Sequence, residues 1–147
     1  MYLLGTKNST TQALTTGASV NLGEVYRKFC RKNSCGVKAF EFNGTSVSLQ
    51  HSGMYHITAT ITFTAPVAGN VIFQLTENGV TIPSALATET ITTATTEVKT
   101  TVIDFYILVD STCVLGTPST LIKNISILNT GVASTISNVV FNVEKVV

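Results

Sequence analysis

Residues 53–64 read GMYHITATITFT and alternate without interruption between apolar and polar positions. One face carries Tyr55, Ile57, Ala59, Ile61 and Phe63, and the other carries His56, Thr58, Thr60, Thr62 and Thr64. Side chains of a strand point to opposite faces with period 2, so this stretch predicts a strand. The alternation leaves open whether the apolar face fills the core of a sandwich or the axis of an oligomer. The threonine face is polar enough to meet water and apolar enough to pack on a neighbour.

Short strands separated by turn signals continue on both sides of this stretch. Branched Thr, Val and Ile dominate, and no sustained period of 3.6 with good helix formers is present. Strands are expected at 18–22, 37–42, 46–49, 71–75, 98–109, 121–128 and 137–147, with an extended piece from Ile82-Pro83 and weak alternation over 89–96. Asn43-Gly44, Glu77-Asn78-Gly79 and Asn129-Thr130-Gly131 are turn sequences. The pattern predicts an all-β fold, a two-sheet sandwich or barrel-like jelly roll over residues 21–147.

Residues 5–17 are small and polar, so residues 1–20 are expected to form an extended attachment arm. The apolar start is too short for the core of a signal peptide and Lys7 lies on its wrong side, so secretion by that route is not expected. No run of about 18 apolar residues exists, and no membrane span is expected.

The composition favours a protein that buries surface in an assembly. Hydrophobic residues make up 44% of the 147 residues and charged residues 12%, against about 25% in ordinary soluble domains. The net charge of +1 gives no sign of a nucleic-acid partner. Residues 102–109 are apolar on both strand faces and must be covered twice. Since no helix is expected to cover them, a second subunit in a closed ring is the simplest cover.

Few residues suggest chemistry. His51 and His56 are read as strand-end histidines, one of them at a subunit interface, rather than metal ligands, because a zinc site needs about four suitable groups. Cys30 and Cys35 allow a small disulfide loop or half of a metal site, Cys113 can pair with either, and free thiols are favoured. No metal site and no cofactor is predicted.

Asp104 interrupts an apolar strand, either as a carboxylate of altered pKa or, as favoured here, as a strand residue with a hydrogen-bonded partner at an interface. No catalytic motif accompanies it, so no enzymatic activity is predicted. Most of the positive charge gathers in one loop, which either docks on an acidic surface or only keeps the protein soluble. The docking candidates are Arg27, Lys28, Arg31 and Lys32, with Lys38 nearby.

Three features together resemble a known family. They are Gly53-Met54-Tyr55 opening a central strand after Val47-Ser48-Leu49, the Asn78-Gly79 hairpin, and the closing strand around Phe141. In this respect residues 37–147 resemble the jelly roll of tumour necrosis factor and of the globular heads of complement's first subcomponent. The stretch ITFTAPVAGNVIFQLTENGVTIPSA is similar to versions carried by phages of Gram-positive gut bacteria and by exosporium proteins. The chain lacks the collagen-like stalk of secreted members.

The resemblance implies a homotrimer and a structural role in a phage virion. The interpretation is a head fibre or capsid decoration protein, assembled in the bacterial cytoplasm and attached to the shell by its N-terminal arm. Its partners would be copies of itself and capsid proteins, without nucleic acid or membrane. The alternative is a receptor- or glycan-binding tip of a tail fibre or spore-surface protein. The trimer interface candidates are Tyr55, Ile57, Phe63, Phe105, Tyr106 and Phe141.

Overall fold

The computed structural model describes residues 2–32, 36–114 and 117–147, and for residues 112–120 only the backbone. Within these residues the chain forms thirteen strands and no helix. The strands are β1 (Tyr2–Asn8), β2 (Gln12–Leu14), β3 (Glu24–Phe29), β4 (Phe40–Phe42), β5 (Ser46–Leu49), β6 (Gly53–Thr64), β7 (Gly69–Glu77), β8 (Val80–Ile91), β9 (Lys99–Val109), β10 (Ser111–Val114), β11 (Thr117–Thr120), β12 (Lys123–Asn129) and β13 (Ser134–Lys145). The described residues include no helix of a length and hydropathy suited to crossing a membrane.

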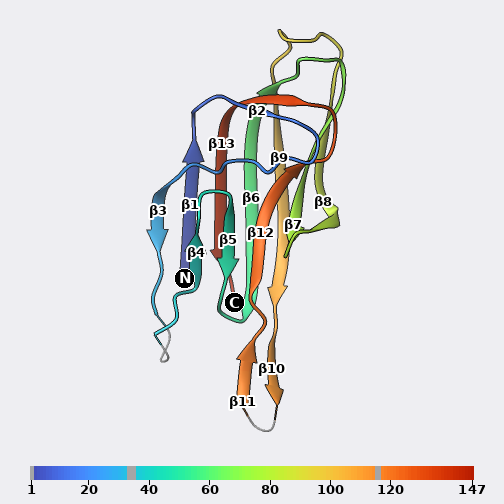
Figure 1. Ribbon diagram of the computed structural model, residues 1–147. Coiled ribbons are helices and arrows are strands. Elements are labelled where there is room, and N and C mark those ends of the chain that lie inside the picture. The colour runs from blue at the N-terminus through green and yellow to red at the C-terminus, as the bar shows by residue number, and fades with distance from the viewer. Residues whose placement is uncertain (1, 33–35, 115–116) are drawn as a thin grey trace.

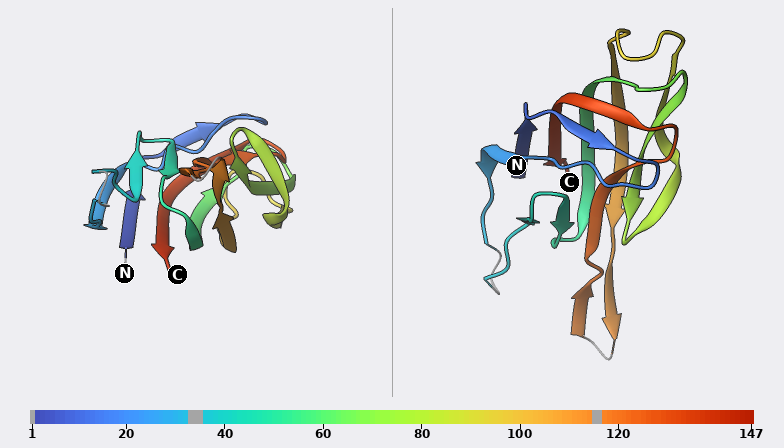
Figure 2. Two further views of the ribbon diagram at one scale, coloured as in Figure 1. Left: turned by 90° about the horizontal axis from the view of Figure 1, so that it is seen from below. Right: turned by 45° about the horizontal axis from the view of Figure 1, so that its top comes forward.

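Two antiparallel sheets pack face to face, and Figure 2 (left) shows them as two layers. Sheet A has the strand order β3-β1-β13-β6-β9, with β2 also paired to β13, and sheet B has the order β4-β5-β12-β7-β8. The hairpin β10-β11 projects beyond one end of the sandwich, and the loop between β8 and β9 forms the tip at the other end (Figure 1). The prediction of an all-β fold of two sheets is confirmed.

The register of β6 places its apolar face in the core. Tyr55, Ile57, Ala59, Ile61 and Phe63 have no exposed surface and pack with residues of sheet B such as Phe40 and Phe73. Burial raises the pKa of the Tyr55 hydroxyl, which donates a hydrogen bond to the His51 carbonyl at 2.7 Å. The threonine face of the same strand therefore points away from the core.

Four of the six trimer interface candidates lie inside the chain's own core. Tyr55, Ile57, Phe63 and Phe141 are fully buried, so their assignment to a subunit interface is wrong. A side chain without exposed surface cannot contact a second copy unless the fold opens. Phe105 is half-buried against the core at the sheet edge, and Tyr106 is the candidate that faces solvent.

The N-terminal residues belong to the folded domain and not to a free arm. β1 pairs along its whole length with β13, from Tyr2–Lys145 to Asn8–Val139, and β2 pairs with the start of β13. Leu4 and Leu14 are buried in the core. The boundary predicted at residue 20 is therefore wrong for residues 2–14. Small and polar residues concealed the strand, because the inward position after Leu4 is the polar Thr6, which is fully buried.

Other strand predictions are confirmed to within a few residues, with three differences. The expected strand at 18–22 is irregular, although Val20 and Leu22 are fully buried and the Val20 amide donates to the Ile127 carbonyl at 2.8 Å. β8 is one strand where two pieces were expected, and its end precedes the loop 92–98. β3 and the hairpin β10-β11 were not predicted. The Asn78-Gly79 turn is confirmed, with φ of 51° and 82° at its two residues.

We expect Gly53→Ala to lower the free energy of unfolding by about 2 kcal/mol or more. Gly53 has φ of 137°, and a Cβ there would lie 2.1 Å from the Val147 carbonyl oxygen. Urea unfolding monitored by circular dichroism measures the loss. The matched control is Gly44→Ala, at φ of 100° with open space around the position, which should cost about 1 kcal/mol. Equal losses in the two variants would contradict the steric argument.

We expect Thr6→Val to raise the free energy of unfolding by about 1 kcal/mol, because it removes a buried hydroxyl that has no hydrogen-bond partner among the described residues. Thr76→Val makes the same change of shape at a buried hydroxyl that is bonded to Ser126, and it should lower the same free energy. Thermal unfolding of both variants tests the contrast. A destabilised Thr6→Val protein would contradict it.

Candidate interaction surfaces

The outer face of sheet A carries the threonines of β6. Residues directly opposite in antiparallel strands share a face, so the registers define rows across the sheet. The rows run Leu3–Glu144–His56–Tyr106, then Gly5–Asn142–Thr58–Asp104, then Lys7–Val140–Thr60–Val102, then Asn138–Thr62–Thr100. In the last three rows, the positions contributed by β13 and β6 hold only Asn, Val and Thr. The centre of this face is therefore uncharged and presents methyl groups beside short hydrogen-bonding groups.

Large apolar side chains are exposed along β9 at the border of this face. Val102 and Tyr106 are each 56% exposed, and Leu108 is 47% exposed. Their neighbours in sequence, Ile103 and Ile107, are buried in the core. The prediction that residues 102–109 present apolar side chains on both faces is thus met. A strand of this kind exposes apolar surface that a partner can cover.

A polar cluster interrupts this apolar border. His56 Nε2 lies 2.8 Å from Asp104 Oδ1, and the His56 ring stacks on the Tyr106 ring with centroids 4.5 Å apart and planes inclined by 14°. Asp104 therefore has a hydrogen-bonded partner, but within its own chain, whereas the sequence led us to expect that partner at an interface. His51 lies elsewhere, with its Nε2 2.8 Å from the Val37 carbonyl oxygen and its ring edge-on to Tyr2. The two histidines are not brought together.

The docking candidates line the opposite border of sheet A. β3 is the edge strand, and all six of its residues are exposed, including Arg27 and Lys28. Arg31 and Lys32 follow it and are also exposed. The backbone of Lys32 forms an isolated antiparallel β-bridge with that of Lys38. The sequence predicted the basic loop but not the strand, because β3 has no apolar face to bury.

Comparisons with known proteins address the fold. No protein-family model matches the chain, and no curated protein matches it either. Among solved structures, the globular domain of a zebrafish complement 1qA protein matches with a TM-score of 0.62 and 8% identity, over 100% of this chain and 98% of that one. The Eiger TNF of S. frugiperda matches with a TM-score of 0.55 and 10% identity, over 99% of this chain and 91% of that one. The PRD1 vertex protein P5 matches with a TM-score of 0.50 and 18% identity, over 97% of this chain and 93% of that one.

The chain has the jelly-roll fold of tumour necrosis factor and the complement globular heads. The resemblance inferred from Gly53-Met54-Tyr55 and the closing strand is thus confirmed at the level of the fold. Within this jelly roll, the first and last strands β1 and β13 lie side by side in sheet A, next to β6 (Figure 1). At these identities the likeness extends to architecture and not to any partner.

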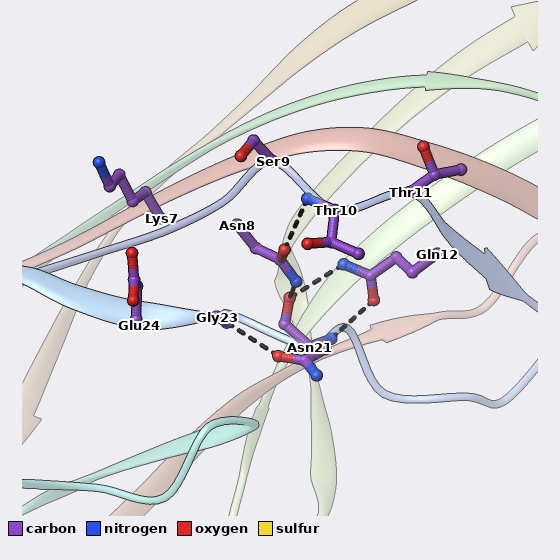
Figure 3. Close-up of a pocket in the computed structure, with 9 residues that line it drawn as sticks. All are labelled: Lys7, Asn8, Ser9, Thr10, Thr11, Gln12, Asn21, Gly23 and Glu24. Carbon is purple, nitrogen blue, oxygen red and sulfur yellow. Dashed lines mark hydrogen bonds between the residues drawn. The ribbon is translucent and has the colours of Figure 1, made fainter.

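A polar hollow lies where β1 leaves sheet A in this jelly roll. Figure 3 shows amide side chains that hold the returning segment in place. The backbone carbonyl of Asn21 accepts hydrogen bonds from Asn8 Nδ2 and Gln12 Nε2, each at 2.9 Å. The backbone N–H of Asn21 donates to Gln12 Oε1 at 2.9 Å. These contacts fix residues 8–21 against one another. Because the polar groups already bond one another, the hollow is read as structural.

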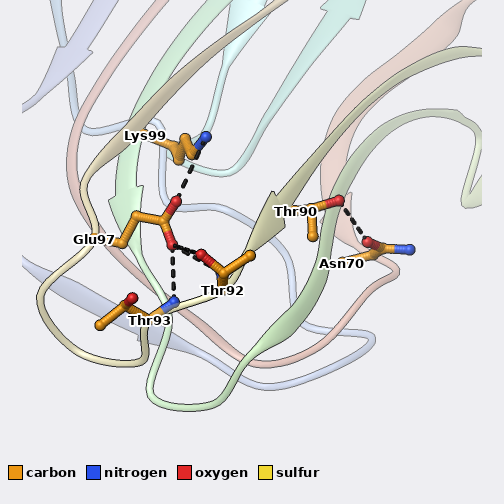
Figure 4. Close-up of polar contacts among 6 residues, drawn as sticks. All are labelled: Asn70, Thr90, Thr92, Thr93, Glu97 and Lys99. Atoms are coloured by element: carbon orange, nitrogen blue, oxygen red, sulfur yellow. Dashed lines mark hydrogen bonds and ion pairs between the residues drawn. The ribbon is translucent and has the colours of Figure 1, made fainter.

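The tip loop between β8 and β9 is held by one carboxylate. Figure 4 shows Glu97 Oε2 accepting bonds from the amides of Thr92 and Thr93, at 2.7 and 2.9 Å, while Oε1 lies 3.5 Å from Lys99 Nζ. These amides, first that of Thr93 and then that of Thr92, lower the pKa of Glu97 below its ordinary value of 4.5, and Lys99 adds a smaller effect. Thr95 in the same loop has φ of 68°, a strained value for a branched residue.

The cysteines supply no site within the described residues. The Cys30 thiol is free, and its sulfur accepts a hydrogen bond from the Ala39 amide at 3.1 Å. Cys35 and the side chain of Cys113 lie outside the described residues. Across ranges 2–32, 36–114 and 117–147, no group of three or more His, Cys, Asp or Glu side chains is arranged to hold a metal ion.

We expect Glu97→Gln to destabilise the protein at neutral pH and to have little effect in acid. A carboxyl with a lowered pKa in the folded state stabilises that state above its unfolded value of 4.5 and loses this contribution as the pH falls through the folded value. Urea unfolding across the acid range, for both proteins, measures the difference. Lys99→Gln is the control, because it should keep most of the pH dependence. A difference that does not change with pH would contradict the assignment to Glu97.

Proposed function

We propose that this chain is a structural protein of a phage virion, a homotrimeric head fibre or capsid decoration protein. One observation carries the proposal: an uncharged Thr, Asn and Val face on sheet A, bordered by exposed apolar residues of β9. Such a surface is suited to burial against another copy, because it costs little to desolvate while its hydroxyls and amides can bond across the contact. Closed three-fold symmetry covers the face without open-ended growth.

The similarity to the PRD1 vertex protein supports the virion part of the proposal. That protein is a vertex protein of PRD1, and the likeness covers 97% of this chain and 93% of that one. The low charge of the chain agrees with surface buried in an assembly. Attachment through a free N-terminal arm is not part of the proposal, because residues 2–14 are built into sheet A.

The corrected interface is the outer face of sheet A. Its members come from three strands and replace the buried candidates. They are Val140 and Asn142 of β13, Thr58, Thr60 and Thr62 of β6, and Val102, Tyr106 and Leu108 of β9. Tyr106 is the one original candidate that belongs to this set.

Purified protein is expected to sediment as a trimer of 15.6 kDa chains at micromolar concentration. Val102→Lys and Leu108→Lys should shift it to monomer, because each buries a charge in the proposed contact. Sedimentation velocity measures the mass, and circular dichroism checks folding. Val67→Lys, at an exposed valine in the loop after β6, is the matched control and should remain trimeric. A wild-type monomer would overturn the proposal of a trimer.

The virion role has a separate test. Antibodies raised against the purified chain should label particles purified from the source of the gene, and immunogold microscopy should place the label on heads. Label confined to tail tips or spore surfaces would favour the alternative, a receptor- or glycan-binding tip. The absence of label on every particle would overturn the virion role while leaving the trimer intact.

A further inference from the structure

β3 ends sheet A with an open backbone edge. Glu24–Phe29 pairs with β1 on one side, and among the described residues no strand lies beyond it on the other side (Figure 1). All six residues are exposed. The amide and carbonyl groups on the outer side of such a strand are available to a further strand.

β3 carries basic side chains and a β-bulge, which commonly protect an edge strand, but it is neither very short nor interrupted by proline. Of the other edges, β4 has only three residues, β8 contains Pro83, which cannot donate to a ladder, and β9 is a longer edge at the far border of sheet A. β3 has six residues and no proline, and it exposes three large apolar side chains: Val25 at 40%, Tyr26 at 44% and Phe29 at 50%. Exposed apolar side chains on an open edge are features of a site that accepts a strand.

A β-bulge turns one of these side chains back over the sheet. The register shifts between Gly5 and Thr6, so that Tyr26 is the extra residue of β3. Its ring lies over Gly5, where an added Cβ would come within 2.9 Å, and its hydroxyl donates to Asn142 Oδ1 at 2.9 Å. Tyr26 is thereby fixed over β1 and β13, on the side of β3 opposite its open edge.

The charge beside this edge selects the partner. Five of the nine Lys and Arg residues lie in the segment 27–38, whereas the nearest carboxylates in sequence are Glu24 and Glu41. The five are Arg27, Lys28, Arg31, Lys32 and Lys38. A segment with acidic side chains beside apolar ones would match both the charges and the exposed side chains of β3.

We propose that β3 accepts an extended acidic segment of a partner protein as an additional strand of sheet A. The segment bonds to the free backbone edge, packs apolar side chains beside Phe29 on the outer face, and pairs its carboxylates with Lys28 on the opposite face. The inference builds on the proposed function by naming how a shell protein would hold this chain. Strand addition at β3 would explain how the basic segment that contains the docking candidates contacts a partner.

The test uses a fluorescein-labelled peptide of alternating glutamate and valine, as long as β3 and its flanks. Fluorescence anisotropy should show binding to the full chain. Hydrogen exchange measured by NMR should show new protection of the backbone amides within Glu24–Phe29 that point away from β1. A peptide with proline in place of its central valine should neither bind nor protect these amides, because it keeps the charge but interrupts the backbone hydrogen bonds to β3. A peptide with lysine in place of glutamate should not bind.

Variants of the chain separate this edge from general charge. Arg27→Glu with Lys28→Glu should weaken peptide binding by roughly tenfold or more. Lys99→Glu with Lys123→Glu changes the net charge equally at distant strands and should leave binding unchanged. Because the peptide controls use wild-type protein, the test remains decisive even if a variant fails to fold.

Several outcomes would overturn the proposal. Failure of the glutamate–valine peptide to bind, equal binding of the proline peptide, or binding without amide protection would exclude strand addition. Equal binding of an oligothymidylate would assign the basic segment to a nucleic acid instead. None of these results bears on trimer formation or on particle labelling, so the strand-addition proposal and the proposed function fail separately.

Discussion

The register of β6 is the constraint on which the other features of this protein depend. β6 pairs with β13 on one side and with β9 on the other over most of its length. Because strand side chains alternate, this register assigns the apolar residues from Tyr55 to Phe63 to the core and every threonine to the outer face. A slip by one residue would bury five polar side chains without partners and expose Tyr55 and Phe63. The cost of such burial fixes the register strongly.

The same register builds the outer surface row by row. Threonines of β6 face asparagine and valine of β13 and the exposed positions of β9. A surface of this composition is neither an ordinary solvated face, which would carry more charge, nor a core. The hydrogen bond between Thr62 and Thr100, at 3.0 Å, shows that its hydroxyls already bond along the sheet. The threonines of β6, whose surroundings the sequence left open, therefore lie on the outer face of sheet A among uncharged polar and small apolar side chains.

The sequence predicted the middle of the fold better than its edges, for a physical reason. β6, β7, β9 and β13 alternate over many residues, and their inward side chains are buried by both sheets, so the pattern is long and clear. β1 is short and carries Gly5 and Lys7 outward, and β3 buries none of its residues. Their strand pairing is decided by the backbone of β13 and β1, which no local pattern records. One question stayed open for the same reason: alternation separates Tyr55 from His56 but does not say whether the Tyr55 face meets the second sheet or a second subunit.

The two candidate surfaces occupy opposite borders of one sheet, and this separation allows both to be used at once. Self-association would cover the side of sheet A formed by β13, β6 and β9, where charge is sparse and apolar side chains lie at β9. The β3 border is basic and retains a free backbone edge. A sheet can be extended at its edge while its face is covered, because ladder bonds lie in the plane of the sheet and face contacts lie perpendicular to it. Tyr26 connects the two regions, since its hydroxyl bonds to Asn142 in the centre of the outer face while its backbone belongs to the edge strand. Covering the face would therefore hold Asn142 in place, and with it the Tyr26 side chain that β3 carries.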